Sequence, residues 1–267
     1  MSYRQCLVAA VFVVGALAST TSQALAATVR TFKTGTFTQA FGINDRGDIV
    51  GGYLGAGFKG FVLSGGIFTT IDVPGSAETN AWGINDRGQI VGEYEDAGRT
   101  HGFLLDHGII TTIDAPGGSS TQALGINDRG DIVGTAAGGG FVLHQGIFTR
   151  IDVPGALFTQ ASGINAGGQI VGRYFDARFV GHGFLLDHGI FTTIDAPFAG
   201  FGPIGINARG DIASGSFPQG YFVLRKGIFT RIDVPFGTFG PIGINTRGDI
   251  VGTVASPSGN SLGFVLS

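Results

Sequence analysis

The sequence has a single cysteine among its 267 residues, Cys6, and it lies close to the N-terminus. The rest of the chain has no thiol that could form a disulfide, bind a soft metal or act as a nucleophile. Charged residues make up only 13% of the chain, about half of the ~25% typical of soluble domains. The net charge of -3 is too small to direct the protein to nucleic acid or to an anionic membrane. We therefore expect no nucleic-acid partner.

Motifs of the common catalytic classes are also missing. The chain has no His-Glu-x-x-His zinc motif, no Gly-x-Ser-x-Gly nucleophile elbow and no phosphate-binding loop. It contains only three glutamates, Glu78, Glu93 and Glu95. A pair of acids for glycoside hydrolysis could still be assembled from aspartates of different units, but nothing selects which. We therefore assign no catalytic residue, no metal site and no cofactor.

The N-terminus has the order of a secretory signal. Arg4 is the only charge before an apolar stretch over residues 7–18, and small polar residues then lead to Ala24-Leu25-Ala26. This order predicts a signal peptide over residues 1–26, with cleavage after the last of them. The apolar stretch is too short to cross a bilayer, which needs ~20 residues. We expect export to the periplasm or beyond, loss of Cys6 with the signal, and no stable membrane insertion afterwards.

Internal repetition is the main feature of the remaining chain, residues 27–267. The triplet Gly-Ile-Asn recurs at a nearly constant, blade-sized interval, beginning at Gly42, Gly83, Gly125, Gly163, Gly205 and Gly243. Each unit continues with a glycine turn, an Ile-Val-Gly-like segment, a variable stretch, a Gly-Phe-Leu-like segment and a Thr-Ile-Asp-like segment. These runs are β-branched or aromatic and lack the 3.6-residue rhythm of helices, so they predict four short strands per unit.

Asn-Asp-Arg-Gly, at residues 44–47, 85–88 and 127–130, predicts a tight hairpin between the first two strands. The asparagine side chain can accept a hydrogen bond from its own backbone further along, and the glycine can adopt a positive φ. The corresponding turns of four of the six units also spell Arg-Gly-Asp, beginning at Arg46, Arg129, Arg209 and Arg247. We interpret that tripeptide as a product of the repeated turn rather than as an adhesion motif.

The two ends of the chain complement each other. The sixth unit, residues 243–267, is short and lacks its fourth strand, whereas residues 27–41 resemble the end of a unit. Joined, the two segments have the length of one full unit. We therefore predict an all-β fold, a six-bladed β-propeller of four-stranded antiparallel blades in which the N-terminal strand completes the last blade. The alternative is an open β-repeat solenoid with capped ends.

The repeated segments resemble the HAF family of bacterial extracellular repeats, whose units combine Gly-Ile-Asn-x-x-Gly-x-Ile-Val-Gly with a His-Ala-Phe-Leu-like segment. The resemblance covers essentially all of residues 27–267. The second segment reads His-Gly-Phe at His101 and His182, whereas the other units begin it with Lys59, Gly139, Gly220 and Leu262. The resemblance implies export and a repeat fold, but no established activity and no catalytic residues.

Candidate binding residues come from the variable stretches of the second and fourth units. There Asp96 with His101, and Asp176 with His182, flank the longest and most polar insertions, which we expect to be surface loops. Solvated loops of a duplicated unit are the alternative interpretation.

Five aspartates occupy one repeat position and could form a collar around the axis that holds a cation, although a turn-forming role is the simpler interpretation. They are Asp72, Asp114, Asp152, Asp195 and Asp233.

Two hypotheses of function follow. The first is a secreted, non-enzymatic binding or surface-interaction module, a monomer whose partner is an extracellular glycan or protein. The second is an extracellular polysaccharide hydrolase or lyase on a propeller scaffold, which would require unequal blades with clustered acids. The near-equivalence of the units favours the first, but fold alone decides neither, because propellers host both.

Overall fold

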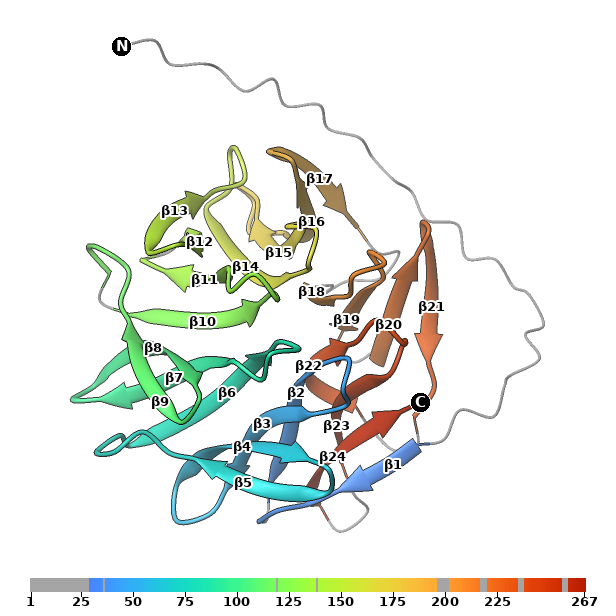
Figure 1. The fold of residues 1–267 in the computed structure, drawn as a ribbon. Coiled ribbons are helices and arrows are strands. Elements are labelled where there is room, and N and C mark those ends of the chain that lie inside the picture. The colour runs from blue at the N-terminus through green and yellow to red at the C-terminus, as the bar shows by residue number, and fades with distance from the viewer. Residues whose placement is uncertain are drawn as a thin grey trace.

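The computed structural model describes residues 29–35, 37–118, 120–137, 139–195, 202–216, 220–234, 238–255 and 259–267. Within these ranges, 24 strands form six four-stranded antiparallel sheets that are arranged as blades around a central axis (Figure 1). This confirms the six-bladed β-propeller, and the alternative of an open solenoid is wrong. The predicted signal peptide lies outside the described residues. No helix in the described part of the chain is long and apolar enough to cross a membrane.

The blades follow the chain in order. Blade 1 contains β2 (Thr38–Ile43), β3 (Ile49–Leu54), β4 (Phe58–Ser64) and β5 (Ile67–Ile71). Blade 2 contains β6 (Glu78–Ile84), β7 (Ile90–Asp96), β8 (Arg99–Asp106) and β9 (Ile109–Ile113). Blade 3 contains β10 (Thr121–Ile126), β11 (Ile132–Ala136), β12 (Gly139–His144) and β13 (Ile147–Ile151).

Blade 4 contains β14 (Phe158–Ile164), β15 (Ile170–Phe175), β16 (Gly181–Asp187) and β17 (Ile190–Ile194). Blade 5 contains β18 (Gly202–Ile206), β19 (Ile212–Ser216), β20 (Gly220–Arg225) and β21 (Ile228–Ile232). Blade 6 contains β22 (Thr238–Ile244), β23 (Ile250–Ala255), β24 (Ser261–Leu266) and the first strand of the chain, β1 (Val29–Phe32).

The N-terminal strand closes the ring, as the complementary ends of the sequence predict. β1 pairs antiparallel with β24, from Val29 opposite Leu266 to Phe32 opposite Gly263. The ring of Phe32 also reaches blade 1, where its centroid lies 6.2 Å from that of Phe61. Blade 6 is therefore built from β1 and from the last three strands of the chain, and β1 lies beside β24 at the lower right of Figure 1.

The glycine of each Gly-Ile-Asn triplet is explained by the close approach of neighbouring blades. The first strand of each blade is innermost, and β22 contacts β2 to complete the circle of inner strands. A Cβ atom on Gly42 would lie 2.8 Å from the carbonyl oxygen of Trp82 in blade 2, and one on Gly243 would lie 2.8 Å from that of Phe41. Any larger residue would push two blades apart at the axis.

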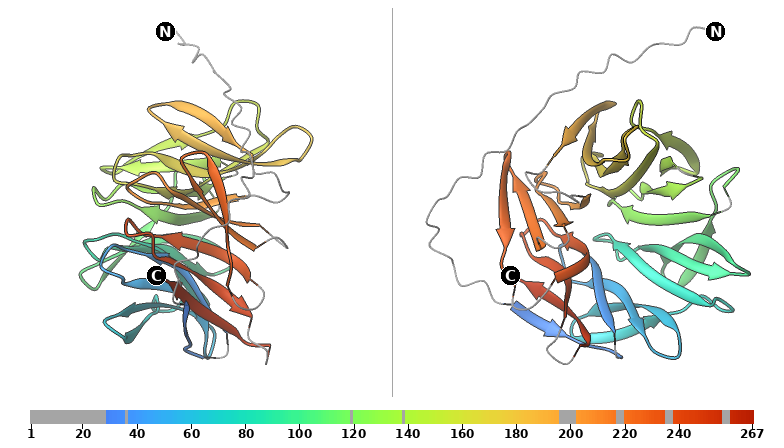
Figure 2. Two further views of the ribbon diagram at one scale, coloured as in Figure 1. Left: turned by 90° about the vertical axis from the view of Figure 1, so that its right-hand side faces the viewer. Right: turned by 180° about the vertical axis from the view of Figure 1, so that it is seen from behind.

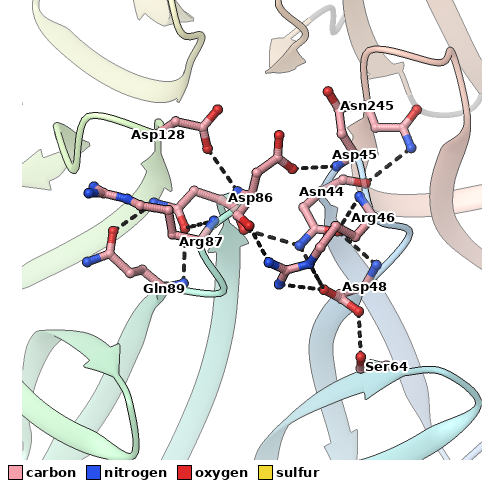
Figure 3. Close-up of polar contacts among 11 residues, drawn as sticks. Asn44, Asp45, Arg46, Asp48, Ser64, Asp86, Arg87, Gln89, Asp128 and Asn245 are labelled. Carbon is pink, nitrogen blue, oxygen red and sulfur yellow. Dashed lines mark hydrogen bonds and ion pairs between the residues drawn. The ribbon is translucent and has the colours of Figure 1, made fainter.

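A circular belt of hydrogen bonds joins the six turns that follow the inner strands. The side chain of Asn44 stabilises its own turn, since its Oδ1 accepts from the backbone N–H of Arg46 (3.1 Å) and of Asp48 (2.9 Å). Its Nδ2 donates onward to the backbone carbonyl of Asn85 in blade 2, at 3.1 Å (Figure 3). The same bond links each blade to the next, through Asn85 to Asn127, Asn127 to Asn165, Asn165 to Asn207, Asn207 to Asn245 and Asn245 to Asn44.

The turn interpretation of Arg-Gly-Asp is supported by the burial of its aspartates. Asp48, Asp131 and Asp211 are each no more than 7% exposed. Gly47 adopts the expected positive φ of 88°. In the first turn, Arg46 and Asn44 both bond the carboxylate of Asp48. A carboxylate held in this way is not presented to a partner.

Candidate functional site

The antiparallel blades give the disc two different faces, seen edge-on in the left view of Figure 2. The Asn turns and the hairpins after the third strands lie on one face, which we call the turn face. The opposite face, which we call the loop face, carries the starts of the inner strands, the connections between the second and third strands and the crossings to the next blade. Asp96, His101, Asp176 and His182 all lie towards the loop face.

In blade 2, Asp96 and His101 lie on strands rather than on an insertion loop. Asp96 ends β7, and only Ala97 and Gly98 separate it from β8, with the two positive φ angles (49° and 76°) of a tight hairpin turn. His101 lies within β8, where its Nδ1 is 2.8 Å from Oδ1 of Asp114 and its ring stacks on Tyr94. The expectation of a long polar loop is therefore wrong here, because the strands extend through it.

In blade 4, Asp176 and His182 do lie together. Oδ2 of Asp176 is 3.7 Å from Nε2 of His182, whose Nδ1 is 2.8 Å from Oδ1 of Asp195. Asp176 also has a local role, since its Oδ1 accepts from the backbone N–H of Arg178 and of Val180, both at 2.8 Å. The N–H of Val180 is the main cause of the lowered pKa of Asp176. The four predicted residues thus lie at two separate places with blade 3 between them, and of the two pairs only Asp176 and His182 come within ion-pair distance of each other.

The alternative of an aspartate collar around the axis is wrong. Asp72, Asp114 and Asp195 follow the outermost strands of their blades, far from the inner circle. Each instead pairs with the residue that begins the Gly-Phe segment on the third strand, as in the 2.7 Å contact between Nζ of Lys59 and Asp72. Among the described side chains, no group of three or more His, Cys, Asp or Glu residues could hold a metal ion.

A pocket of about 560 Å³ lies in the central channel, and it was not predicted. Each inner strand has an irregular register just before its Gly-Ile-Asn glycine, as between Ala40 and Gly42. Such an irregularity re-aims the extra residue, and here it lines the channel. The residues at this position are Phe41, Trp82, Leu124, Ser162, Ile204 and Ile242. Trp82 stacks on Phe41 with ring centroids 4.2 Å apart, so one side of the wall is aromatic.

The pocket is asymmetric and extends over blade 4. Blade 4 places the small Ser162 where blades 1 and 2 place aromatic rings, and Gln160, Arg173 and Tyr174 then add polar atoms to the wall. The ring of Tyr174 also stacks on His182, with centroids 5.0 Å apart. His182, one of the predicted binding residues, thus packs behind the pocket wall through Tyr174.

Arg173 is a cation without a carboxylate partner in this wall. Its Nε donates to Oε1 of Gln160 at 2.6 Å. No carboxylate of the described residues lies within the 4.0 Å of an ion pair. The residue is exposed to solvent, and the protein around its guanidinium nevertheless lowers the pKa of that group through partial desolvation. Most other arginines of the described part pair with an aspartate, as Arg46 does with Asp48 at 2.8 Å.

Glu93 occupies in blade 2 the position that Arg173 occupies in blade 4. Burial raises the pKa of its carboxyl group, against the effect of a hydrogen bond donated by the side-chain amide of Gln122, which lines the pocket. The Nε1–H of Trp82 lies near enough to the Glu93 carboxylate to favour its ionised form, although the two groups make no hydrogen bond of normal geometry. Glu78 opposes ionisation through its like charge. A proton is therefore held more readily on Glu93 than on an exposed glutamate.

A signal for these two residues was present in the sequence. The position after each Ile-Val-Gly-like segment holds Gly52, Glu93, Thr135, Arg173, Gly215 and Thr253, whereas the segment itself is nearly unchanged. In a repeat protein, a position that varies between otherwise similar units is not required by the fold. Comparing the units column by column would have selected Glu93 and Arg173 before either histidine.

Comparison with solved structures finds other propellers. A gluconolactonase-like propeller superimposes with a TM-score of 0.55 at 15% identity, over 91% of this chain and 93% of the other. A glucose dehydrogenase-like protein from Thermus thermophilus gives 0.52 at 13% identity, over 90% and 100%. A triple mutant of AofleA from Arthrobotrys oligospora gives 0.50 at 12% identity, over 90% and 86%. At these identities the likeness shows the fold alone.

No protein-family profile matches the chain, and no curated protein matches its sequence.

Proposed function

We propose that the protein is a secreted binding module that holds the end of an extracellular glycan in the channel pocket on its loop face. The pocket carries this proposal. Its volume of about 560 Å³ falls within the ~300–1,000 Å³ of ordinary small-ligand sites, and few polar groups converge on a largely apolar wall.

The lining suits a sugar ring. The aromatic side formed by Phe41 and Trp82 offers an apolar surface to the C–H face of a ring. The amides of Gln122 and Gln160 supply both donors and acceptors for hydroxyl groups. The rigid circle of inner strands would hold these groups in place before binding, which limits the entropy lost when the ligand binds.

The signal-like N-terminus supports an extracellular role, and the repeat segments support membership of the HAF family of exported repeats. The pairs Asp96 with His101 and Asp176 with His182 are proposed as a secondary surface around the pocket. We propose that the exported chain acts as a monomer, because β1 supplies the outer strand of blade 6 from the same chain and no blade needs a strand from a second copy.

The proposal is tested by filling the pocket. Ser162→Phe copies the aromatic residue that blades 1 and 2 already carry at this position, so it should fold while occupying the space above blade 4. Thr69→Phe places the same ring on the exposed outer strand of blade 1 and serves as the control. Purified residues 27–267 and both variants are applied to a broad glycan array. We expect selective binding that Ser162→Phe abolishes and Thr69→Phe retains, and equal binding by all three proteins would overturn the proposal.

An extracellular hydrolase or lyase is the second candidate, and Glu93 is the observation that favours it. A half-buried carboxyl group with a raised pKa holds its proton more readily than an exposed one, as a general acid must. The likeness to gluconolactonase-like and glucose dehydrogenase-like propellers makes lactones a sensible substrate to add to polysaccharides in an assay. Cleavage that disappears in Glu93→Gln but not in the exposed Glu95→Gln would favour the enzyme, whereas binding without cleavage favours the module.

A further inference from the structure

The charge in the pocket wall is concentrated on one side. Arg173 projects from β15 in blade 4, and the corresponding positions of the adjacent blades hold the uncharged Thr135 and Gly215. Glu93, the only acid at this repeat position, lies two blades away and bonds Gln122. The guanidinium therefore faces the pocket with no carboxylate of the described chain within ion-pair distance.

Arg173 is also oriented for a ligand. Its Nε is engaged by Oε1 of Gln160, which fixes one edge of the guanidinium plane. The two terminal nitrogens remain as parallel donors, the arrangement that binds a carboxylate through two hydrogen bonds at once. Gly215, at the corresponding position of the adjacent blade 5, also lines the pocket and adds no side chain to it.

From this arrangement we propose that the ligand is an acidic saccharide, and that Arg173 binds the carboxylate of its uronic acid residue. The inference rests on the proposed glycan-binding function and names the class of glycan. The carboxylate lies over blade 4, and the sugar ring extends towards the aromatic side formed by Phe41 and Trp82. Desolvation destabilises the charged form of the Arg173 guanidinium, and the negative charge of a bound carboxylate would stabilise that form.

The test compares matched sugars by isothermal titration calorimetry. The probes are D-glucuronate and D-galacturonate, their neutral counterparts D-glucose and D-galactose, and acetate as a carboxylate without a sugar. The unchanged protein should bind the acidic sugars at least about tenfold more tightly than the neutral ones, a difference of about 1.4 kcal/mol. Raising the NaCl concentration should weaken only the acidic sugars, because salt screens the charge contribution.

Three variants complete the test. Arg173→Gln should lose about tenfold or more in affinity for the acidic sugars and leave the neutral ones unchanged. Arg173→Lys keeps the charge but lacks the planar pair of donors, so it should lose less. Arg178→Gln removes an exposed arginine from the nearby 176–180 loop and should change nothing.

The outcomes separate the two proposals. Equal affinity for acidic and neutral sugars, equal losses in Arg173→Gln and Arg178→Gln, or acetate binding as tightly as glucuronate would each overturn the acidic-sugar inference. If neutral sugars still bind and Ser162→Phe still blocks them, the glycan-binding function stands without it. If no saccharide of either kind binds, both proposals fail.

Discussion

The side-chain amide of Asn245, in blade 6, donates a hydrogen bond to the backbone carbonyl of Asn44, in blade 1, at an N···O distance of 3.2 Å. The two residues are 201 positions apart in the chain. Figure 3 shows both beside the turns that they stabilise. This bond is the last of six equivalent ones, so the belt of asparagines reports directly on whether the ring is closed.

Replacing Asn245 with Ala should lower the free energy of unfolding by about 3 kcal/mol, because the change removes the side-chain hydrogen bonds to the carbonyl of Asn44 and to the carboxylate of Asp249, and it takes the acceptor from the backbone N–H of Asp249. Each such loss costs about 1–3 kcal/mol. Urea denaturation followed by tryptophan fluorescence measures the difference. Thr246→Ala, in the same turn, is the control, because Thr246 contributes only its backbone N–H, to Asp45. A loss under about 1 kcal/mol in Asn245→Ala would contradict the structural role of the belt.

Phe32 tests the closure by β1. Phe32→Ala should lower the free energy of unfolding by about 2 kcal/mol, since this half-buried ring packs against Phe61 and Phe68 of blade 1 as well as against blade 6. Arg30→Ala, on the same strand but exposed, should stay within about 0.5 kcal/mol of the parent. The urea midpoints of unfolding of the two variants and of the parent measure these differences. Equal stability of the two variants would mean that β1 does not hold the ring together.

Asp131 should make the protein sensitive to acid. Burial alone would raise its pKa, but hydrogen bonds from His144, Asn127 and Arg129 outweigh burial and hold the pKa below its usual value. A lowered pKa in the folded state gives stability that is present above the unfolded value of about 3.9 and is lost as the pH falls through the folded value. Asp131→Asn should therefore be about 1–2 kcal/mol less stable at pH 7, with a shallower loss of stability below pH 4. Denaturation curves from pH 7 to pH 2.5 measure both effects.

The exposed Asp233 is the matched control for this prediction. Asp233→Asn removes a carboxylate that is 3.6 Å from Arg231 but almost fully in solvent, so the free energy of unfolding of this variant should change with pH as that of the parent does. If Asp131→Asn and Asp233→Asn have the same pH dependence, the buried turn carboxylates do not cause the acid sensitivity.

Glu93 should have the opposite dependence on pH. Burial raises the pKa of its carboxyl group in the folded state, so its contribution to stability is complete below the unfolded value of about 4.3 and is lost as the pH rises through the folded value. Glu93→Gln keeps an acceptor for Gln122 and removes the charge. It should be about 1 kcal/mol more stable than the parent at pH 7, with the difference closing near pH 4.

Glu95→Gln provides the comparison for Glu93, because Glu95 lies two residues further along the same strand and is exposed. Its stability relative to the parent should not change with pH between 4 and 7. A Glu93→Gln variant that is less stable than the parent at pH 7 would show that the ionised carboxylate stabilises the blade.

Much of the architecture was predictable because it depends on local and periodic information. The interval between Gly-Ile-Asn triplets sets the number of blades, and the complementary ends of the chain determine closure through β1. The turn chemistry was predictable for the same reason: the side chain of Asn44 bonds the backbone within four residues, and Gly47 needs only its own φ angle. Neither depends on how the blades are oriented in space.

Tertiary structure alone decided which side chains meet. The order of strands predicts which neighbours pair, but not that the first strand is innermost. The sequence therefore left open an aspartate collar at the axis, whereas these aspartates follow the outermost strands. The irregular register before each Gly-Ile-Asn glycine directs one residue, such as Ser162, into the channel. A register shift of one residue moves the side chains of a strand to the opposite face of its sheet. Arg173 lines the pocket directly and Glu93 reaches it through Gln122 of the next blade, and neither arrangement can be read from the local sequence of one blade.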